Sequence, residues 1–413
     1  MNKHKIWAIG TLASFAYQKP IFMLTSMDRL NPRLYDLFFI WGLFLFWNVL
    51  SKPIDNAVLK IWRKMIILMT VCCAVYAVLI PPATYAFSLY YLFKYIEGFL
   101  IIKMLFNCRE ILTADLIEKV LIAGGVFVTI YCIPEAMRFE SVEVELAPGK
   151  YVVMPPGWFT GPFGSYFALS QYSAIAAIVA LSRYVRNQKF KVLNLGLTLF
   201  VAYPAFSCGS RTGMFLLLFS SVFFLILSNH KKEILLLSAV FVISIVFLAN
   251  RQGMDPMSYL IENNNTFIRL MEQEGDETLS VQGRFSFFER FKFMNYDYWF
   301  LMPFIGSGFY VSPILGYFRV GYGFHNNYIF AFEQLGLIGL FYFLSLMFGT
   351  FKTTYRQRFV NYFSMPICAL IFAYLIVNFS GQSFWQGFGN GEMNTLIIYL
   401  MSISVSEEFK INI

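Results

Sequence analysis

The chain is 413 residues long, and 58% of its residues are hydrophobic while only 14% are charged. Soluble domains are about 45–50% apolar and about 25% charged, so this chain has too little polar surface to coat a water-soluble globule of its size. The composition therefore excludes a soluble enzyme, a disulfide-stapled secreted domain and a disordered scaffold, and it predicts an integral membrane protein. The net charge of +8 is attributed to cytoplasmic loops that orient helices, not to a nucleic-acid surface.

Apolar segments that can cross a bilayer recur along the chain. A hydrocarbon core about 30 Å thick needs roughly 20 apolar residues per helix, and by this measure we expect about twelve transmembrane helices in one all-α bundle. No internal repeat is evident in the sequence. The predicted spans are 5–25, 34–50, 65–81, 86–106, 116–133, 164–182, 192–208, 213–229, 233–249, 327–349, 362–379 and 393–405.

Basic residues alternate between the two ends of the predicted helices. The positive-inside rule places the basic turns, and with them both termini, in the cytoplasm. The long loops at 134–163 and 250–326 then face outward, as extracytoplasmic parts of a single polytopic domain that covers 1–413. The turns that fix this orientation contain Lys60 and Arg63, Arg183 and Arg186, Lys231 and Lys232, and Lys352 and Arg356.

The first candidate site is the turn at 207–213, between two predicted spans. Arg211 is the only charged residue between Lys191 and His230, and a helix is predicted to begin beside it. The start of a helix carries unpaired N–H groups and partial positive charge, so an arginine there would make an anion-binding site. The alternative is an interfacial arginine that extends to lipid headgroups.

The second candidate lies in the larger outer loop, at 282–291. Read as a helix at about 100° per residue, its phenylalanines form one face with Arg284 in the middle. A charge on an apolar face is costly unless it is paired or used, so Arg284 is a functional candidate. Arg290 points away from this face and is expected to be solvated, and we retain it as a third candidate contact for the same anion.

The third candidate is the sequence His325-Asn326-Asn327-Tyr328, where another predicted span opens. His325 is the only one of the three histidines on the predicted outer side. A histidine at a helix start can accept a proton, bind phosphate or cap the helix. Glu333 lies roughly 80° around the same helix, as either an acidic partner of the histidine or a buried structural carboxyl.

Other polar features are interpreted first as structural. Lys94 and Glu97 are three residues apart on a predicted span and are expected to form an ion pair, with substrate contact as the alternative. The aromatic turn at 155–164 would anchor the chain at the interface or form a wall against a sugar ring. The sequence contains no evident metal-ligand set, so we expect chemistry that uses no metal and no cofactor.

In this order, the three segments resemble the O-antigen polymerase and O-antigen ligase superfamily. The resemblance covers about residues 200–345 and also includes 303–308 and the stretch from Glu333 to Gly339. It implies a GT-C-like glycosyltransferase at the outer, periplasmic face of the bacterial inner membrane, with its donor glycan on undecaprenyl diphosphate. By this resemblance, Arg211 and Arg284 look like diphosphate-binding arginines. His325 is then the first candidate for the catalytic base, with Glu333 the second.

Polymerases and ligases share these motifs. Ligases often carry a threonine where this chain has Leu340, which favours a polymerase that adds the growing glycan to the next lipid-linked repeat unit. A ligase would transfer the glycan to lipid A–core instead. A transporter or flippase for the glycan is the alternative from another class, disfavoured because the motif residues lie in or beside the outer loops. The partners implied are membrane lipid, a flippase and a chain-length regulator, with no nucleic acid.

Overall fold

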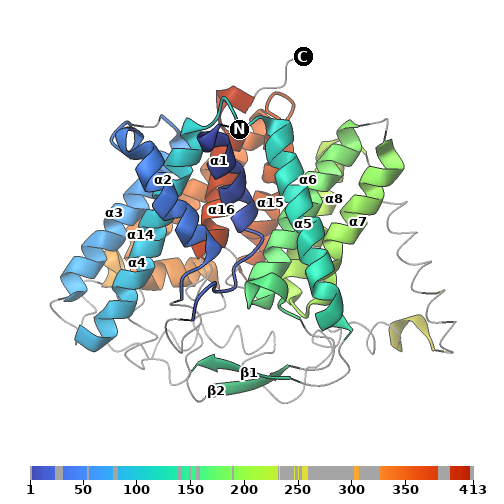
Figure 1. The fold of residues 1–413 in the computed structure, drawn as a ribbon, viewed down its shortest axis with the longest axis horizontal. Coiled ribbons are helices and arrows are strands. Elements are labelled where there is room, and N and C mark those ends of the chain that lie inside the picture. Colours follow the sequence, from blue (N-terminus) through green and yellow to red (C-terminus); the bar gives the residue numbers. More distant parts are fainter. Residues whose placement is uncertain are drawn as a thin grey trace. The chain divides into compact units, whose positions relative to one another are not determined.

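The computed structural model is a helical protein with one small β-hairpin (Figure 1). It describes residues 2–23, 31–53, 55–77, 82–137, 142–147, 150–154, 159–187, 190–230, 254–258, 302–306, 326–379 and 391–409, with 232, 246 and 250. The helices are α1 (Lys3–Ser14), α2 (Leu34–Leu50), α3 (Ala57–Ala77), α4 (Pro82–Asn107), α5 (Ala114–Ala136), α6 (Tyr166–Arg186), α7 (Lys191–Ser207), α8 (Arg211–Leu227), α13 (Met302–Ile305), α14 (Asn327–Arg356), α15 (Ser364–Val377) and α16 (Gly391–Ser404), with short 3-10 turns η2 (Gly161–Phe163) and η6 (Glu407–Phe409).

The predicted helical character is confirmed, and the hairpin adds to it. Strands β1 (Val142–Ala147) and β2 (Lys150–Met154) pair antiparallel inside the loop predicted at 134–163. Val142 lies opposite Met154, and the register shifts between Glu145 and Ala147. This loop therefore contains secondary structure that the hydropathy pattern did not predict.

Two helices meet the length and hydropathy of a membrane span: α5, and the part of α14 from Gln334 to Arg356. The apolar helices α2, α7, α8 and α15 are shorter. Among the described residues the structure thus supplies two such helices, where the sequence predicts about twelve. The span predicted at 233–249 lies almost entirely outside the described residues.

The first predicted span is wrong in its length. The prediction extends over 5–25, but α1 ends at Ser14. The backbone N–H groups of Gln18 and Lys19 both donate to the carbonyl oxygen of Pro162, at 2.9 Å. Because these donors bind another segment, they do not continue the ladder of the helix.

The chain packs into two compact units. Unit 1 contains Met1–Ala8, Phe38–Thr113 and Asp276–Ile413, and unit 2 contains Ile9–Leu37 and Ala114–Gly275. The sequence predicts one domain, so this division is a structural finding.

The core of unit 2 is helix α6, which packs against α5, α7 and α8 (Figure 1). Every side chain from 168 to 182 is buried. Small residues allow the close packing, because a Cβ on Gly125 of α5 would lie 2.9 Å from the Cβ of Ala176. A Cβ on Gly213 of α8 would lie 2.1 Å from the Cβ of Ser170. Such small-residue contacts are the usual means by which membrane helices approach one another.

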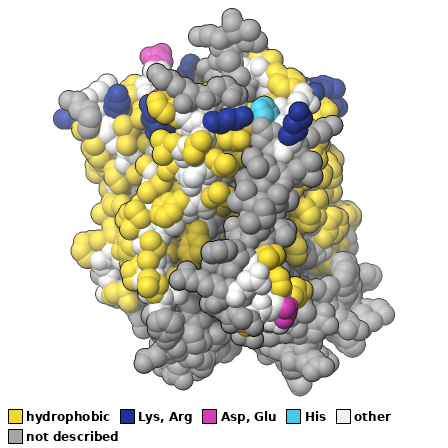
Figure 2. All heavy atoms as spheres, turned by 90° about the vertical axis from the view of Figure 1, so that its right-hand side faces the viewer, with side chains coloured by type: hydrophobic (Ala, Val, Ile, Leu, Met, Phe, Trp, Pro, Cys, Tyr) yellow, Lys and Arg dark blue, Asp and Glu magenta, His cyan; other side chains and the backbone are white. Residues whose placement is uncertain are grey.

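The surface of unit 2 formed by α7 and α8 is apolar, and we call it the apolar flank. On α7, Val192 is 87% exposed and Leu193 61%, and α8 exposes Leu218 and Val222. Figure 2 shows hydrophobic side chains over much of the described flank, with Lys and Arg side chains gathered towards one end. An apolar flank that ends in a basic rim is typical of a surface in contact with lipid.

Unit 1 contains a buried polar contact between α4 and α16. The predicted pair on α4 is confirmed, since Lys94 Nζ lies 2.9 Å from Glu97 Oε2 and the Glu97 side chain is 1% exposed. Asn394 of α16 donates to the Tyr95 hydroxyl at 3.2 Å. A buried charge that is paired in this way costs far less than an isolated one.

Candidate functional site

The predicted helix start at Arg211 is confirmed, and it is held by a buried cap. Ser210 is the N-cap of α8, and its side-chain oxygen accepts from the Gly213 N–H at 3.1 Å. The Ser210 hydroxyl also lies 3.0 Å from that of Ser170 on α6. Gly209 precedes the cap with φ of 89°, in the left-handed region that favours glycine. These contacts fix the backbone from which the half-buried Arg211 side chain extends.

The charge of Arg211 opposes the dipole of its own helix. The first turn of a helix carries partial positive charge, so a cation there is unfavourable by roughly 0.3–1 kcal/mol. An anion held between the guanidinium and the helix start would gain from both, which makes this end of α8 an anion-site candidate.

A cluster of polar residues lies at the same end of unit 2, where α5 and α7 end and α6 and α8 begin. Glu135 Oε2 accepts from the backbone N–H groups of Thr160 (3.1 Å) and Gly161 (2.9 Å). Its other oxygen lies 3.5 Å from Lys19 Nζ. Lys19 also lies 5.1 Å from the ring centroid of Tyr131. No sequence pattern indicates this cluster, because Lys19 and Glu135 are far apart in the chain.

The aromatic turn predicted at 155–164 divides into two parts. Residues 155–158 lie outside the described residues. Phe159 is 1% exposed and stacks on Tyr203 of α7, with ring centroids 6.1 Å apart and an interplanar angle of 12°. Phe159 is therefore a packing residue, whereas its stacking partner Tyr203 is 41% exposed.

In unit 1, the two asparagines of the His-Asn-Asn-Tyr sequence anchor the start of α14. Asn326 Oδ1 accepts from the N–H groups of Tyr328 (2.9 Å) and Ile329 (3.1 Å). Asn327 donates to Asn378 twice, from its backbone N–H to the carbonyl oxygen at 2.9 Å and from Nδ2 to Oδ1 at 2.6 Å. These side chains cap the helix and join it to the end of α15, which assigns them a structural role.

Two segments of the resemblance meet in unit 1. Helix α14 is broken at Gly336, which has φ of 65° and ψ of −164°. A Cβ at Gly336 would lie 2.3 Å from the carbonyl carbon and oxygen of Phe304 in α13. The backbone of the Glu333–Gly339 stretch thus lies directly against the backbone of the 303–308 segment. A residue larger than glycine at 336 would not fit between them.

The other predicted site residues have these positions. Arg284, Arg290 and His325 lie outside the described residues, and Glu333 contributes its backbone to α14. Arg211 belongs to unit 2 and Glu333 to unit 1. In the part of the chain that the structure describes, no three His, Cys, Asp or Glu side chains gather as a metal-ion site. No protein-family model matches the sequence, and no curated protein matches it either.

The anchor between α14 and α15 can be tested by Asn378→Ala. This change removes the acceptor of the buried Asn327 amide, and losing the partner of a buried donor costs about 1–3 kcal/mol. We expect the free energy of unfolding, measured by denaturant titration of the purified protein in detergent, to fall by that amount. Thr353→Ala is the control, since it removes only a bond to Gly349 within the same helix. Equal stability of the two variants would contradict the anchoring role.

Proposed function

We propose that the protein is an integral membrane glycosyltransferase that polymerises lipid-linked oligosaccharide repeat units. It transfers the growing glycan from undecaprenyl diphosphate to the next lipid-linked unit, at the periplasmic face of the bacterial inner membrane. The observation that carries the proposal is the start of α8, where a buried cap presents Arg211 at a helix N-terminus suited to a diphosphate. The contact of Gly336 with Phe304, which joins two segments of the resemblance, supports it.

The proposed reaction needs a stabilised leaving group and a base. The acceptor hydroxyl oxygen bonds to the anomeric carbon of the donor glycan as the bond from that carbon to the diphosphate oxygen breaks. The electron pair of the broken bond leaves with the lipid diphosphate, where Arg211 and Arg284 stabilise the developing charge. The hydroxyl proton passes to His325, or to Glu333 as the second candidate. In this scheme Arg290 is a lesser contact, and no metal ion takes part.

A membrane-spanning bundle is part of the proposal. The two span-length helices and the apolar flank of unit 2 are consistent with it. The full set of about twelve spans and the GT-C-like arrangement rest on hydropathy and resemblance. A flippase would deliver the lipid-linked units, and a chain-length regulator would act on the product.

Deletion of the gene in its host tests the activity directly, with surface lipopolysaccharide separated on a silver-stained gel. Core bearing a single repeat unit, with the longer ladder absent, is the result expected of a polymerase. Bare core with long chains retained on the carrier lipid would identify a ligase instead. An unchanged ladder would overturn both activities for this glycan and favour the transporter.

Arg284 and Arg290 are predicted to lie on different faces of one helix, so their substitutions should have different effects. Arg284→Ala is expected to abolish the polymer, because the arginine on the predicted aromatic face is the one assigned to the diphosphate. Arg290→Ala is expected to leave most of it. Complementation of the deletion strain with each variant, at equal protein level, provides the measurement. A null phenotype for Arg290→Ala with an active Arg284→Ala variant would show that the assignment is reversed.

A further inference from the structure

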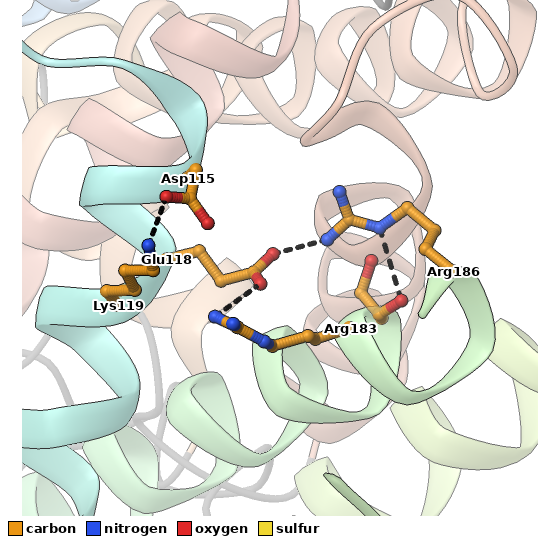
Figure 3. Close-up of polar contacts among 6 residues, drawn as sticks. Asp115, Glu118, Lys119, Arg183 and Arg186 are labelled. Carbon is orange, nitrogen blue, oxygen red and sulfur yellow. Dashed lines mark hydrogen bonds and ion pairs between the residues drawn. The ribbon is translucent and has the colours of Figure 1, made fainter. Parts of the chain in front are cut away.

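A charged cluster lies at the end of unit 2 opposite Arg211, where α5 begins and α6 ends (Figure 3). Glu118 of α5 projects between Arg183 and Arg186, which lie in the last turn of α6. Glu118 Oε1 is 3.3 Å from Arg183 Nη1, and Glu118 Oε2 pairs with Arg186 Nη2. The Glu118 side chain is only 2% exposed, so the carboxylate is the buried member of the cluster.

The cluster retains positive charge at its surface. Two guanidiniums around one carboxylate leave a net charge of +1, and the neighbouring Asp115–Lys119 pair adds none. The arginine side chains are 27% and 29% exposed, against 2% for the carboxylate. The negative charge is therefore buried, and the positive charge is the part of the cluster exposed at the protein surface.

The two arginines are also held in place. Arg186 Nε donates to the Ser182 carbonyl oxygen at 3.2 Å, which together with Glu118 fixes the plane of its guanidinium. A guanidinium that is already oriented loses less conformational entropy when it binds a further anion, and its planar fork matches phosphate oxygens. One arginine would be enough to pair with Glu118 and link α5 to α6, but the cluster has two, one helical turn apart.

We propose that the Glu118–Arg183–Arg186 cluster binds a phosphate group, that of an anionic phospholipid headgroup. The cluster lies at the end of unit 2 where Lys191 begins α7, and the exposed Val192 and Leu193 follow directly. The acyl chains of a bound phospholipid would thus lie along this apolar flank while the headgroup phosphate contacts the arginines. The inference does not depend on the polymerase activity.

The test compares lipid retention by the full-length protein. The variant is the triple change Glu118→Gln, Arg183→Gln and Arg186→Gln, which leaves no unpaired charge buried. It lowers the net charge by one, as does the control Arg356→Gln, an exposed arginine at the end of α14. The proteins, purified in detergent, are titrated with short-chain phosphatidylglycerol, phosphatidylcholine or inorganic phosphate, and bound ligand is counted by native mass spectrometry.

We expect the triple variant to bind phosphatidylglycerol about tenfold more weakly than the wild type, since it loses the charge-assisted bonds to phosphate. Arg356→Gln is expected to bind as the wild type does. Preference for phosphatidylglycerol over inorganic phosphate would support a lipid headgroup, and equal binding of both would support the phosphate site but assign it to the free ion. Equal phosphatidylglycerol binding by the wild type and the triple variant would overturn the proposal, leaving only a tie between helices.

Discussion

Arg211→Ala is expected to abolish the polymer without unfolding the protein. Removing one donor that stabilises transition-state charge costs a factor of about 10²–10³ in kcat, and the leaving diphosphate here carries most of that charge. The substitution itself favours α8, because alanine is a better helix former than arginine and an unfavourable cation is removed from the helix start. Polymer length in a complemented deletion strain and turnover by purified protein provide the measurement.

Two further variants separate chemistry from folding at this position. Arg211→Lys keeps the charge but not the planar fork and should retain partial activity. Ser210→Ala removes the N-cap that accepts from Gly213, so it should lower the unfolding free energy by about 1 kcal/mol. A normal ladder with Arg211→Ala would contradict the diphosphate role, whatever the other variants do.

The regular helices of this chain follow from local sequence. The predicted span at 34–50 coincides with α2, and the turn at 207–213 gives way to a helix at Arg211 as expected. Apolar length and a serine before the first turn are properties of neighbouring residues, which a sequence analysis can detect. The β-hairpin also has a local signal, the alternating valine and glutamate residues at 142–145, which hydropathy averaging conceals.

Contacts between distant residues could not be predicted in this way. In the sequence, Arg183 and Arg186 indicate only the predicted cytoplasmic side. In the structure both bind Glu118, more than sixty residues earlier in the chain. The early end of α1 likewise depends on a carbonyl at Pro162. Such pairings arise from how helices pack, and no spacing within one segment encodes them.

Gly336→Ala is the second change with a large expected effect, on both stability and polymer. At φ of 65° an alanine is strained, and its Cβ would overlap the Phe304 backbone, which cannot rotate away as a side chain can. Backbone strain and overpacking each cost about 1–3 kcal/mol. The unfolding free energy in detergent should therefore fall by roughly 2–6 kcal/mol, and complementation should fail.

Gly349→Ala is the matched control on the same helix. An added Cβ there meets no atom within 4 Å, so alanine should be neutral or stabilising by about 0.5–1 kcal/mol. If Gly336→Ala were as stable as Gly349→Ala, the close approach of α13 to α14 would be wrong. If instead it were destabilised but kept its polymer, the contact would serve folding alone. Loss of both would support the meeting of these two segments as part of the catalytic structure.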